Sequence, residues 1–158
     1  MLMNSSSLTK PLTFVSSAAL YDLGQLYHDN STGRIYRYVK AAAACATDVI
    51  TLLHAVCWDE GGEWIVNNDV AGGTGLGVVA PAGVIIAPLP ELYFGWIQVA
   101  GLALCIGDGS IAKADAVVLD AGNDGQIDTM ADGEEEQVFG TAIEADAPNV
   151  NIILKTLV

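Results

Sequence analysis

The stretch Tyr93–Gly107, YFGWIQVAGLALCIG, decides the fold. It carries no charge, it is rich in aromatic and β-branched residues, and glycines interrupt it where a strand would bulge or bend. These features predict a buried strand at the centre of a sheet. The residues expected to form this core strand, or an oligomer contact along it, are Tyr93, Phe94, Trp96, Ile97 and Val99.

Upstream of this strand, a loop separates two strand-like segments. Leu23–His28 and Arg34–Ala41 flank Asp29–Gly33, a sequence that suits the loop of a hairpin. Successive side chains of a strand point to opposite faces, so the second segment is expected to alternate. One face carries Ile35, Arg37 and Val39, and the other carries Tyr36, Tyr38 and Lys40.

The remaining segments predict more short strands with turn signals between them. Asp48–Val56 is apolar and fits either a strand or a short helix, because period alone does not separate the two. Regularly spaced short strands predict an all-β fold, a compact antiparallel β-sandwich or barrel with short loops. Strands are expected at Glu63–Asn67, Val78–Ala87 (as two short strands broken at Pro81–Gly83), Ala116–Leu119, Gln126–Thr129, Gln137–Glu144 and Asn149–Leu157.

The N-terminus differs in composition from the rest of the chain. Met1–Thr13 is polar and rich in serine and threonine, which predicts a flexible arm. Such a segment is either a frayed terminus or an arm that becomes ordered on a neighbouring protein. We therefore expect an arm over residues 1–13 and a single β-rich domain over residues 14–158.

The composition constrains the partners of this domain. Only 16% of the 158 residues are charged and 52% are hydrophobic, whereas a soluble domain has about 25% charged residues. Part of the surface is therefore expected to be covered by other subunits, which predicts a homo-oligomer. The net charge of −13 repels phosphate backbones and anionic lipids, so neither nucleic acid nor a membrane is expected as a partner.

The sequence shows no catalytic motif. The histidines are His28 and His54, and His54 lies in an apolar run where a core histidine is more common than a catalyst. Gly72–Gly77 lacks the Lys-Ser/Thr pair of a phosphate-binding loop, and Asp120–Gly125 departs from a calcium loop. We expect no enzyme, cofactor or metal, although cation binding by the acidic loops stays open. The cysteines, expected to act as small hydrophobes, are Cys45, Cys57 and Cys105.

Several short motifs follow one another in the order found in a family of small phage proteins. That order is an aromatic-Gly-Trp segment, an apolar strand, a spacer, a hairpin, a Gly-x-Ala segment and a final strand. In this order the chain resembles the capsid decoration, or cement, proteins of tailed bacteriophages. Asp48–Gly77, with Trp58 and Trp64, does not match the pattern. The matching segments are Gly33–Ala41, Tyr93–Gly101, Ala116–Leu119 with Gly125, Val138–Ala142 and Val150–Leu154.

This resemblance implies a structural virion protein on the outer surface of an icosahedral capsid. Its expected partners are the major capsid protein and further copies of the same chain, as trimers or dimers. Two alternatives stay open: a tail or fibre module, and a carbohydrate-binding β domain that uses Tyr36, Tyr38 or Trp96. The second requires an exposed aromatic row, whereas the apolar neighbours of Trp96 predict that this residue is buried. The candidate capsid-contact residues of the arm are Ser5, Ser6, Ser7, Leu8, Thr9, Lys10 and Pro11.

Overall fold

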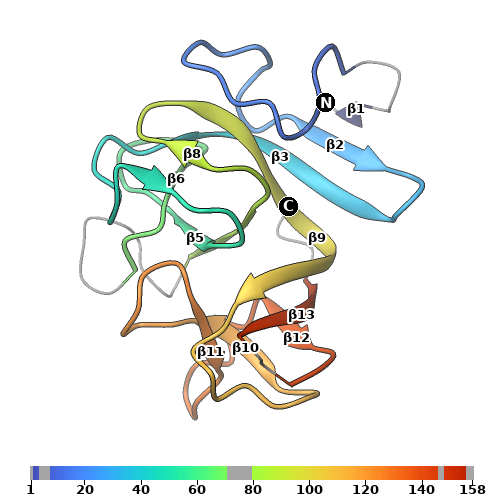
Figure 1. Ribbon diagram of the computed structural model, residues 1–158, viewed down its shortest axis with the longest axis vertical. Coiled ribbons are helices and arrows are strands. Elements are labelled where there is room, and N and C mark those ends of the chain that lie inside the picture. The colour runs from blue at the N-terminus through green and yellow to red at the C-terminus, as the bar shows by residue number, and fades with distance from the viewer. Residues whose placement is uncertain (1, 4–7, 71–79, 146–147, 156–158) are drawn as a thin grey trace.

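The computed structural model describes residues 2–3, 8–70, 80–145 and 148–155, and within them the chain forms strands and no helix. No helix of this part is therefore long and apolar enough to cross a bilayer. The predicted all-β class is confirmed, and its form is a small barrel joined to a second sheet (Figure 1). The strands are β1 (Leu2–Met3), β2 (Leu26–Asp29), β3 (Arg34–Ala41), β4 (Val49–Ile50), β5 (Ala55–Trp58), β6 (Ile65–Asn67), β7 (Pro81–Ile85), β8 (Leu89–Pro90), β9 (Phe94–Ile106), β10 (Ala116–Leu119), β11 (Ile127–Thr129), β12 (Gly140–Ala142) and β13 (Asn149–Leu154).

Five of the described strands close into a barrel in the order β3-β6-β5-β7-β9, because β9 pairs with β3 as well as with β7. The β3–β6 contact is parallel, and the other contacts of the wall are antiparallel. Closure removes the unpaired edges that an open sheet would expose. Buried aliphatic side chains from all five wall strands fill the interior: Val39, Ala41, Val56, Val66, Ala82, Ile85, Ile97 and Val99.

The long strand β9 belongs to the barrel and to the second sheet. Its residues 94–100 pair with β3, and its residues 101–106 pair with β13. From β13 the second sheet continues in the order β12-β10-β11, in the lower half of Figure 1. Tyr93–Gly107 therefore contains the central strand that the sequence predicts, and this strand also links the two sheets.

A second apolar core lies between the barrel wall and the second sheet. Ala55 and Val84 contribute from the outer face of the barrel, and Cys105 contributes from β9. Cys57 and Cys105 are fully buried in this core, which confirms the expectation for these two cysteines, whereas Cys45 is half-buried. The members from the second sheet include Val117, Leu119, Ile127, Ala142, Val150, Ile152 and Leu154.

A third cluster is aromatic and covers the outer face of β2, β3 and β9. Tyr38 and Trp96 are 1% and 3% exposed, and their ring centroids lie 5.1 Å apart. Tyr21 covers both rings, with centroid distances of 5.1 Å and 5.4 Å. The N-terminal segment that contains Leu8, Leu12 and Tyr21 therefore covers this outer face of the barrel and buries its aromatic side chains. The buried aromatic members are Tyr27, Tyr36, Tyr38 and Trp96.

A bend at Gly101 lets β9 leave the barrel. This residue has a φ of 86°, and a Cβ there would lie 3.1 Å from the carbonyl oxygen of Gly33. Both facts favour glycine, since other residues rarely adopt this conformation and a Cβ would be in tighter contact with the Gly33–Arg34 backbone than is usual. Beside the bend, the buried Gln98 donates from Nε2 to the carbonyl oxygens of Ala100 and Leu102, at 3.1 Å and 2.8 Å.

Some strand boundaries differ from the expectations. β7 continues through Pro81–Gly83, where a break was expected. Pro81 opens the strand, where a missing N–H is tolerated, and Gly83 lets the Gln98 carbonyl approach closely, since an added Cβ would lie 2.5 Å from that oxygen. Asp48–Val56 forms the two-residue β4 and the start of β5, separated by a turn. Gln137–Glu144 shortens to β12, and the Gly72–Gly77 loop lies outside the described residues.

Alanine substitutions at Gly101 and Gly33 should differ in cost. Both positions have positive φ, but nothing lies within 4 Å of a Cβ at Gly33. Gly33→Ala should lower the free energy of unfolding by about 1 kcal/mol, and Gly101→Ala by about 2 kcal/mol or more. Urea denaturation measures both values. If the two variants lose the same free energy of unfolding, the close approach of Gly33 and Arg34 to Gly101 does not constrain the bend of β9.

Candidate functional site

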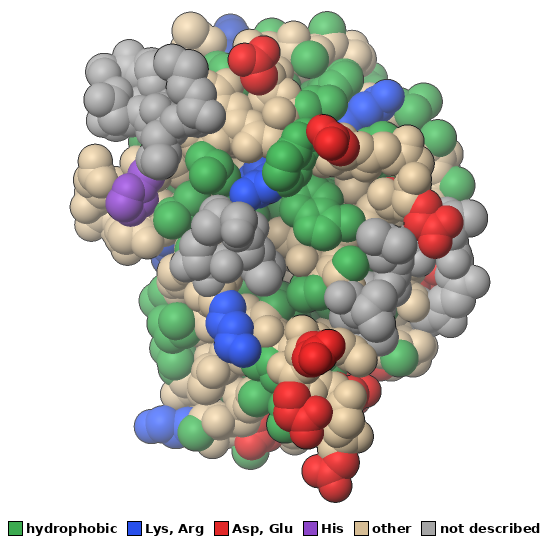
Figure 2. All heavy atoms as spheres, turned by 180° about the vertical axis from the view of Figure 1, so that it is seen from behind, with side chains coloured by type: hydrophobic (Ala, Val, Ile, Leu, Met, Phe, Trp, Pro, Cys, Tyr) green, Lys and Arg blue, Asp and Glu red, His purple; other side chains and the backbone are tan. Residues whose placement is uncertain are grey.

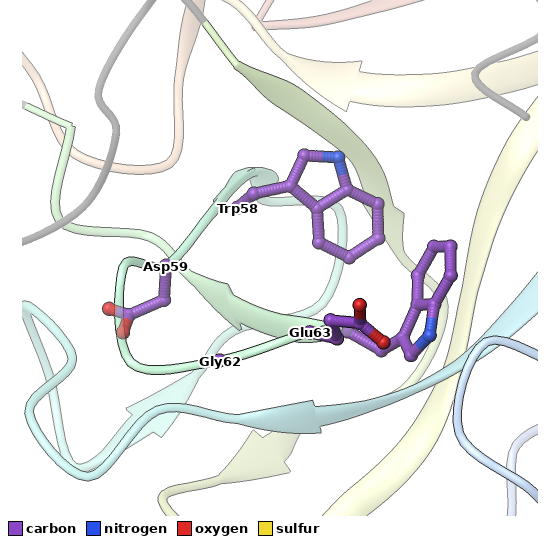
Figure 3. Close-up of a pocket in the computed structure, with 5 residues that line it drawn as sticks. Trp58, Asp59, Gly62 and Glu63 are labelled. Atoms are coloured by element: carbon purple, nitrogen blue, oxygen red, sulfur yellow. The ribbon is translucent and has the colours of Figure 1, made fainter.

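A pocket of about 400 Å³ opens beside the loop that joins β5 to β6. Trp58 ends β5, Trp64 precedes β6, and Asp59, Gly62 and Glu63 line the pocket between them. Figure 3 shows the Trp58 indole and the Glu63 carboxylate on the same side of the loop, whereas the Asp59 carboxylate points away from the ring. Trp58 also packs against the barrel interior. The pocket therefore lies at a mouth of the barrel, a common position for small-ligand sites.

The two indoles of this pocket contact one buried guanidinium. Arg37 lies on the inward face of β3 with Val39, as the alternation predicts, and its side chain is 5% exposed. Its Cζ atom lies 4.2 Å from the ring centroid of Trp64 and 5.9 Å from that of Trp58. Nε has no hydrogen-bond partner among the described residues, and burial lowers the pKa of the guanidinium. The cation–π contacts thus offset part of the desolvation of this charge.

The loop and the Trp64 indole are held in place by local contacts. Asp59 accepts hydrogen bonds from the Gly61 N–H at 2.7 Å and from Asn67 Nδ2 at 3.0 Å. Trp64 has a φ of 61°, which is unusual for a bulky residue and shows that its surroundings determine its conformation. Gly24 is one of these surroundings: a Cβ there would lie 2.6 Å from Trp64 Nε1. A side chain at position 24 would therefore displace the indole.

Sequence reasoning did not identify this pocket. The segment WDEGGEW, Trp58–Trp64, matches no motif, and its tryptophans lie in the region that the phage-protein pattern does not cover. The one local feature that could have indicated a pocket is the pair of tryptophans on either side of an acidic, glycine-containing turn. The distance between the rings, 5.5 Å in an edge-to-face arrangement, depends on the pairing of β5 with β6.

A second candidate site is the outer strip, which we define as Leu102 and Leu104 of β9 with Ile153 of β13. Leu102 and Ile153 are register partners, and the three side chains are 37%, 37% and 47% exposed. The solvent face of an antiparallel sheet is usually polar, so large aliphatic side chains there indicate an interaction surface. Beside the strip, Leu52 lines a groove of about 200 Å³ together with Leu102 and Leu104.

The predicted arm residues lie in two situations. Ser5, Ser6 and Ser7 are outside the described residues. Leu8 packs against the aromatic cluster, as does Leu12. The backbone N–H groups of Thr9 and Lys10 donate to the Tyr21 hydroxyl at 3.1 Å and 3.2 Å, and Pro11 accepts from the Phe14 N–H at 2.9 Å. Residues 8–13 therefore lie against the domain.

The aromatic residues of the carbohydrate-binding alternative are not exposed. Tyr36, Tyr38 and Trp96 are buried in the aromatic cluster, so this alternative loses the exposed aromatic row that it requires. The predicted alternation of β3 is correct, since Tyr36 and Tyr38 lie together on the aromatic face, but the N-terminal segment covers this face. Of the predicted core-strand residues, Trp96, Ile97 and Val99 are buried, Phe94 is half-buried, and Tyr93 is 38% exposed.

The acidic loops use their carboxylates to hold their own backbone. Asp120 accepts from the Gly122 N–H and from Asn123 Nδ2, and Asp124 accepts from the Val70 N–H at 2.9 Å. Among the described residues, no group of three His, Cys, Asp or Glu side chains could hold a metal ion. His54 is half-buried, and burial lowers its pKa. Its Nδ1 lies 3.3 Å from Asn68 Nδ2.

Comparisons with known proteins find similarity at the level of the fold. No family model matches the sequence. No curated protein matches it either. The fold is similar to the crystal structure of the head fiber gp8.5 N base in bacteriophage phi29, with a TM-score of 0.53 and 13% sequence identity. The match covers 78% of this chain and 95% of that chain. At this identity the similarity establishes a common fold.

Two substitutions of Arg37 should separate packing from charge. Arg37→Ala removes the stem and both ring contacts, and should lower the free energy of unfolding by about 2 kcal/mol. Arg37→Met keeps an apolar stem and removes the unpartnered Nε, and should stay within about 1 kcal/mol of the wild type. Urea denaturation measures both values. If Arg37→Met lowers the free energy of unfolding as much as Arg37→Ala does, the charge that contacts the indoles stabilises the barrel mouth more than the apolar stem of the side chain does.

Proposed function

We propose that the chain is a structural protein of a tailed-phage virion that decorates the outer surface of the icosahedral head. The main support is the shared fold with the N base of a phage head fiber, of which 95% is covered. The order of motifs in the sequence, which resembles that of capsid decoration proteins, is independent support. A fibre or tail module of the virion is the second candidate, because the similar structure is itself part of a head fiber.

The outer strip offers a contact surface for this role. A specific protein interface buries about 1,200–2,000 Å² in total, and its centre is apolar. Leu102, Leu104 and Ile153 provide such a centre, and the groove lined by Leu52 adds a concave area beside it. We propose the major capsid protein as the partner at this surface, with further copies of the chain, as dimers or trimers, as the second class of partner.

The charge distribution is consistent with an exterior position. Figure 2 shows acidic side chains at the end of the molecule that holds the second sheet in Figure 1 and also on the opposite half. With a net charge of −13, the protein is repelled by packaged DNA. Apolar side chains reach the surface between the charged ones on the face shown in Figure 2.

Co-sedimentation with undecorated heads of the phage that encodes the chain tests the proposal. The wild-type protein should bind at a fixed, saturable copy ratio. Leu104→Asp with Ile153→Asp should lower the affinity at least tenfold, because each charge would be desolvated in an apolar interface. The matched control is Val49→Asp, an exposed strand position (40%) on the separate β4–β8 sheet, which should bind like the wild type.

The outcomes separate the two candidates. Failure of the folded wild-type protein to bind heads, with binding to purified tails or fibres, would favour the second candidate. If the strip variant and the control bind heads equally well, the decoration role stands but the outer strip is not its contact surface.

Deletion of residues 1–7 tests the arm separately. Residues 8–13 remain, because Leu8 and Leu12 cover the aromatic cluster. We expect weaker attachment to heads by a domain that still folds, since the removed residues include Ser5, Ser6 and Ser7. The urea midpoint should fall only slightly, because the deletion also removes the two-residue strand β1, which pairs with β2. Unchanged occupancy on heads would remove the arm from the proposed contact.

A further inference from the structure

We propose that the pocket at Trp58 binds a neutral saccharide. This site is separate from the outer strip, and the inference does not depend on a virion role. Its residues are not those of the carbohydrate-binding alternative considered from the sequence, which are buried. The volume of about 400 Å³ is within the range of small-molecule sites.

Trp58 is the platform of the pocket. Its indole borders the open volume and is half-buried, so part of the ring still meets solvent. The Trp64 ring has the closer contact with the Arg37 guanidinium and also packs against Gly24. The role of Trp64 is therefore to orient the Trp58 ring by edge-to-face contact at 5.5 Å. A rigid indole gives the C–H face of a pyranose a large contact area at little entropic cost.

Glu63 supplies the acceptor beside this platform. Its side chain is exposed, it lines the pocket, and Figure 3 shows its carboxylate on the same side of the loop as the Trp58 ring. A carboxylate accepts hydrogen bonds from sugar hydroxyls, and charge-assisted bonds are the stronger ones. Asp59 is committed to Gly61 and Asn67, so it holds the loop. Gly62 presents no side chain at the rim, which allows a ligand to approach the backbone.

The charges around the pocket favour a neutral ligand. Asp59, Glu60 and Glu63 lie on the loop and repel anions. A cationic ligand would compete with Arg37, whose guanidinium already lies on Trp64 and within 5.9 Å of Trp58. The three carboxylates attract a cation to the loop, but a second positive charge placed on the indoles themselves would be repelled at short range by the first. A neutral polyhydroxy ring uses the stacking face and the carboxylate acceptor without this cost.

A glycan array with neutral and sialylated oligosaccharides, followed by calorimetric titration of the retained glycan and of choline chloride, tests the inference on the full chain. The wild-type protein should retain neutral glycans and give no heat with choline. Trp58→Ala should abolish detectable binding, and Glu63→Gln should weaken it at least tenfold.

Two matched controls isolate the pocket. Glu60→Gln changes an exposed carboxylate of the same loop that does not line the pocket, and Tyr93→Ala removes an exposed aromatic ring elsewhere. Both should bind within twofold of the wild type. Retention of no neutral glycan, preference for choline or sialylated glycans, or equal binding by Glu63→Gln and Glu60→Gln would overturn the inference. Since Glu63 is exposed, its variant keeps the test valid if Trp58→Ala fails to fold.

Discussion

The backbone pairing of β9 is the constraint on which the rest of the structure depends. Over residues 94–100 it closes the barrel by joining β3 to β7, and over residues 101–106 it starts the second sheet through β13. Inward side chains such as Ile97 and Val99 fill the barrel, and Ala103 and Cys105 fill the second core. One strand thus contributes to both cores, so loosening its bend would affect both.

The two candidate surfaces follow from this arrangement. Where the N-terminal segment covers the outer wall of the barrel, aromatic side chains are buried and no surface is available. Where β9 leaves the barrel, its outward residues Leu102 and Leu104 have no such cover and form the outer strip with Ile153. At the barrel mouth, the inward alternation of β3 places Arg37 where an aliphatic side chain would otherwise lie. The indoles of Trp58 and Trp64 contact this charge, and the pocket forms beside them.

Much of the fold could be predicted from local patterns. The uncharged β-branched run of β9, the glycine-bearing loop between β2 and β3, and the alternation of Ile35 to Lys40 report local preferences that the tertiary structure preserves. Predictions failed where a distant segment decides the environment. β7 passes through Pro81–Gly83 because Pro81 and Gly83 pair with β5, and the next residues, Val84 and Ile85, pair with β9. No property of these segments alone contains that information.

The sequence by itself determined the all-β class, the central strand, the hairpin around Asp29–Gly33 and the acidic composition with its low fraction of charged residues, since these depend on residue type and on periods of two. Only the tertiary structure decided that the sheet closes between β3 and β9 and which aromatic residues reach solvent. The pocket is the clearest case: Trp58, Glu63 and Arg37 become neighbours only when β3, β5 and β6 pair. Closure of the barrel is a long-range property, because it requires hydrogen bonds between β3 and β9, which lie more than fifty residues apart in the sequence.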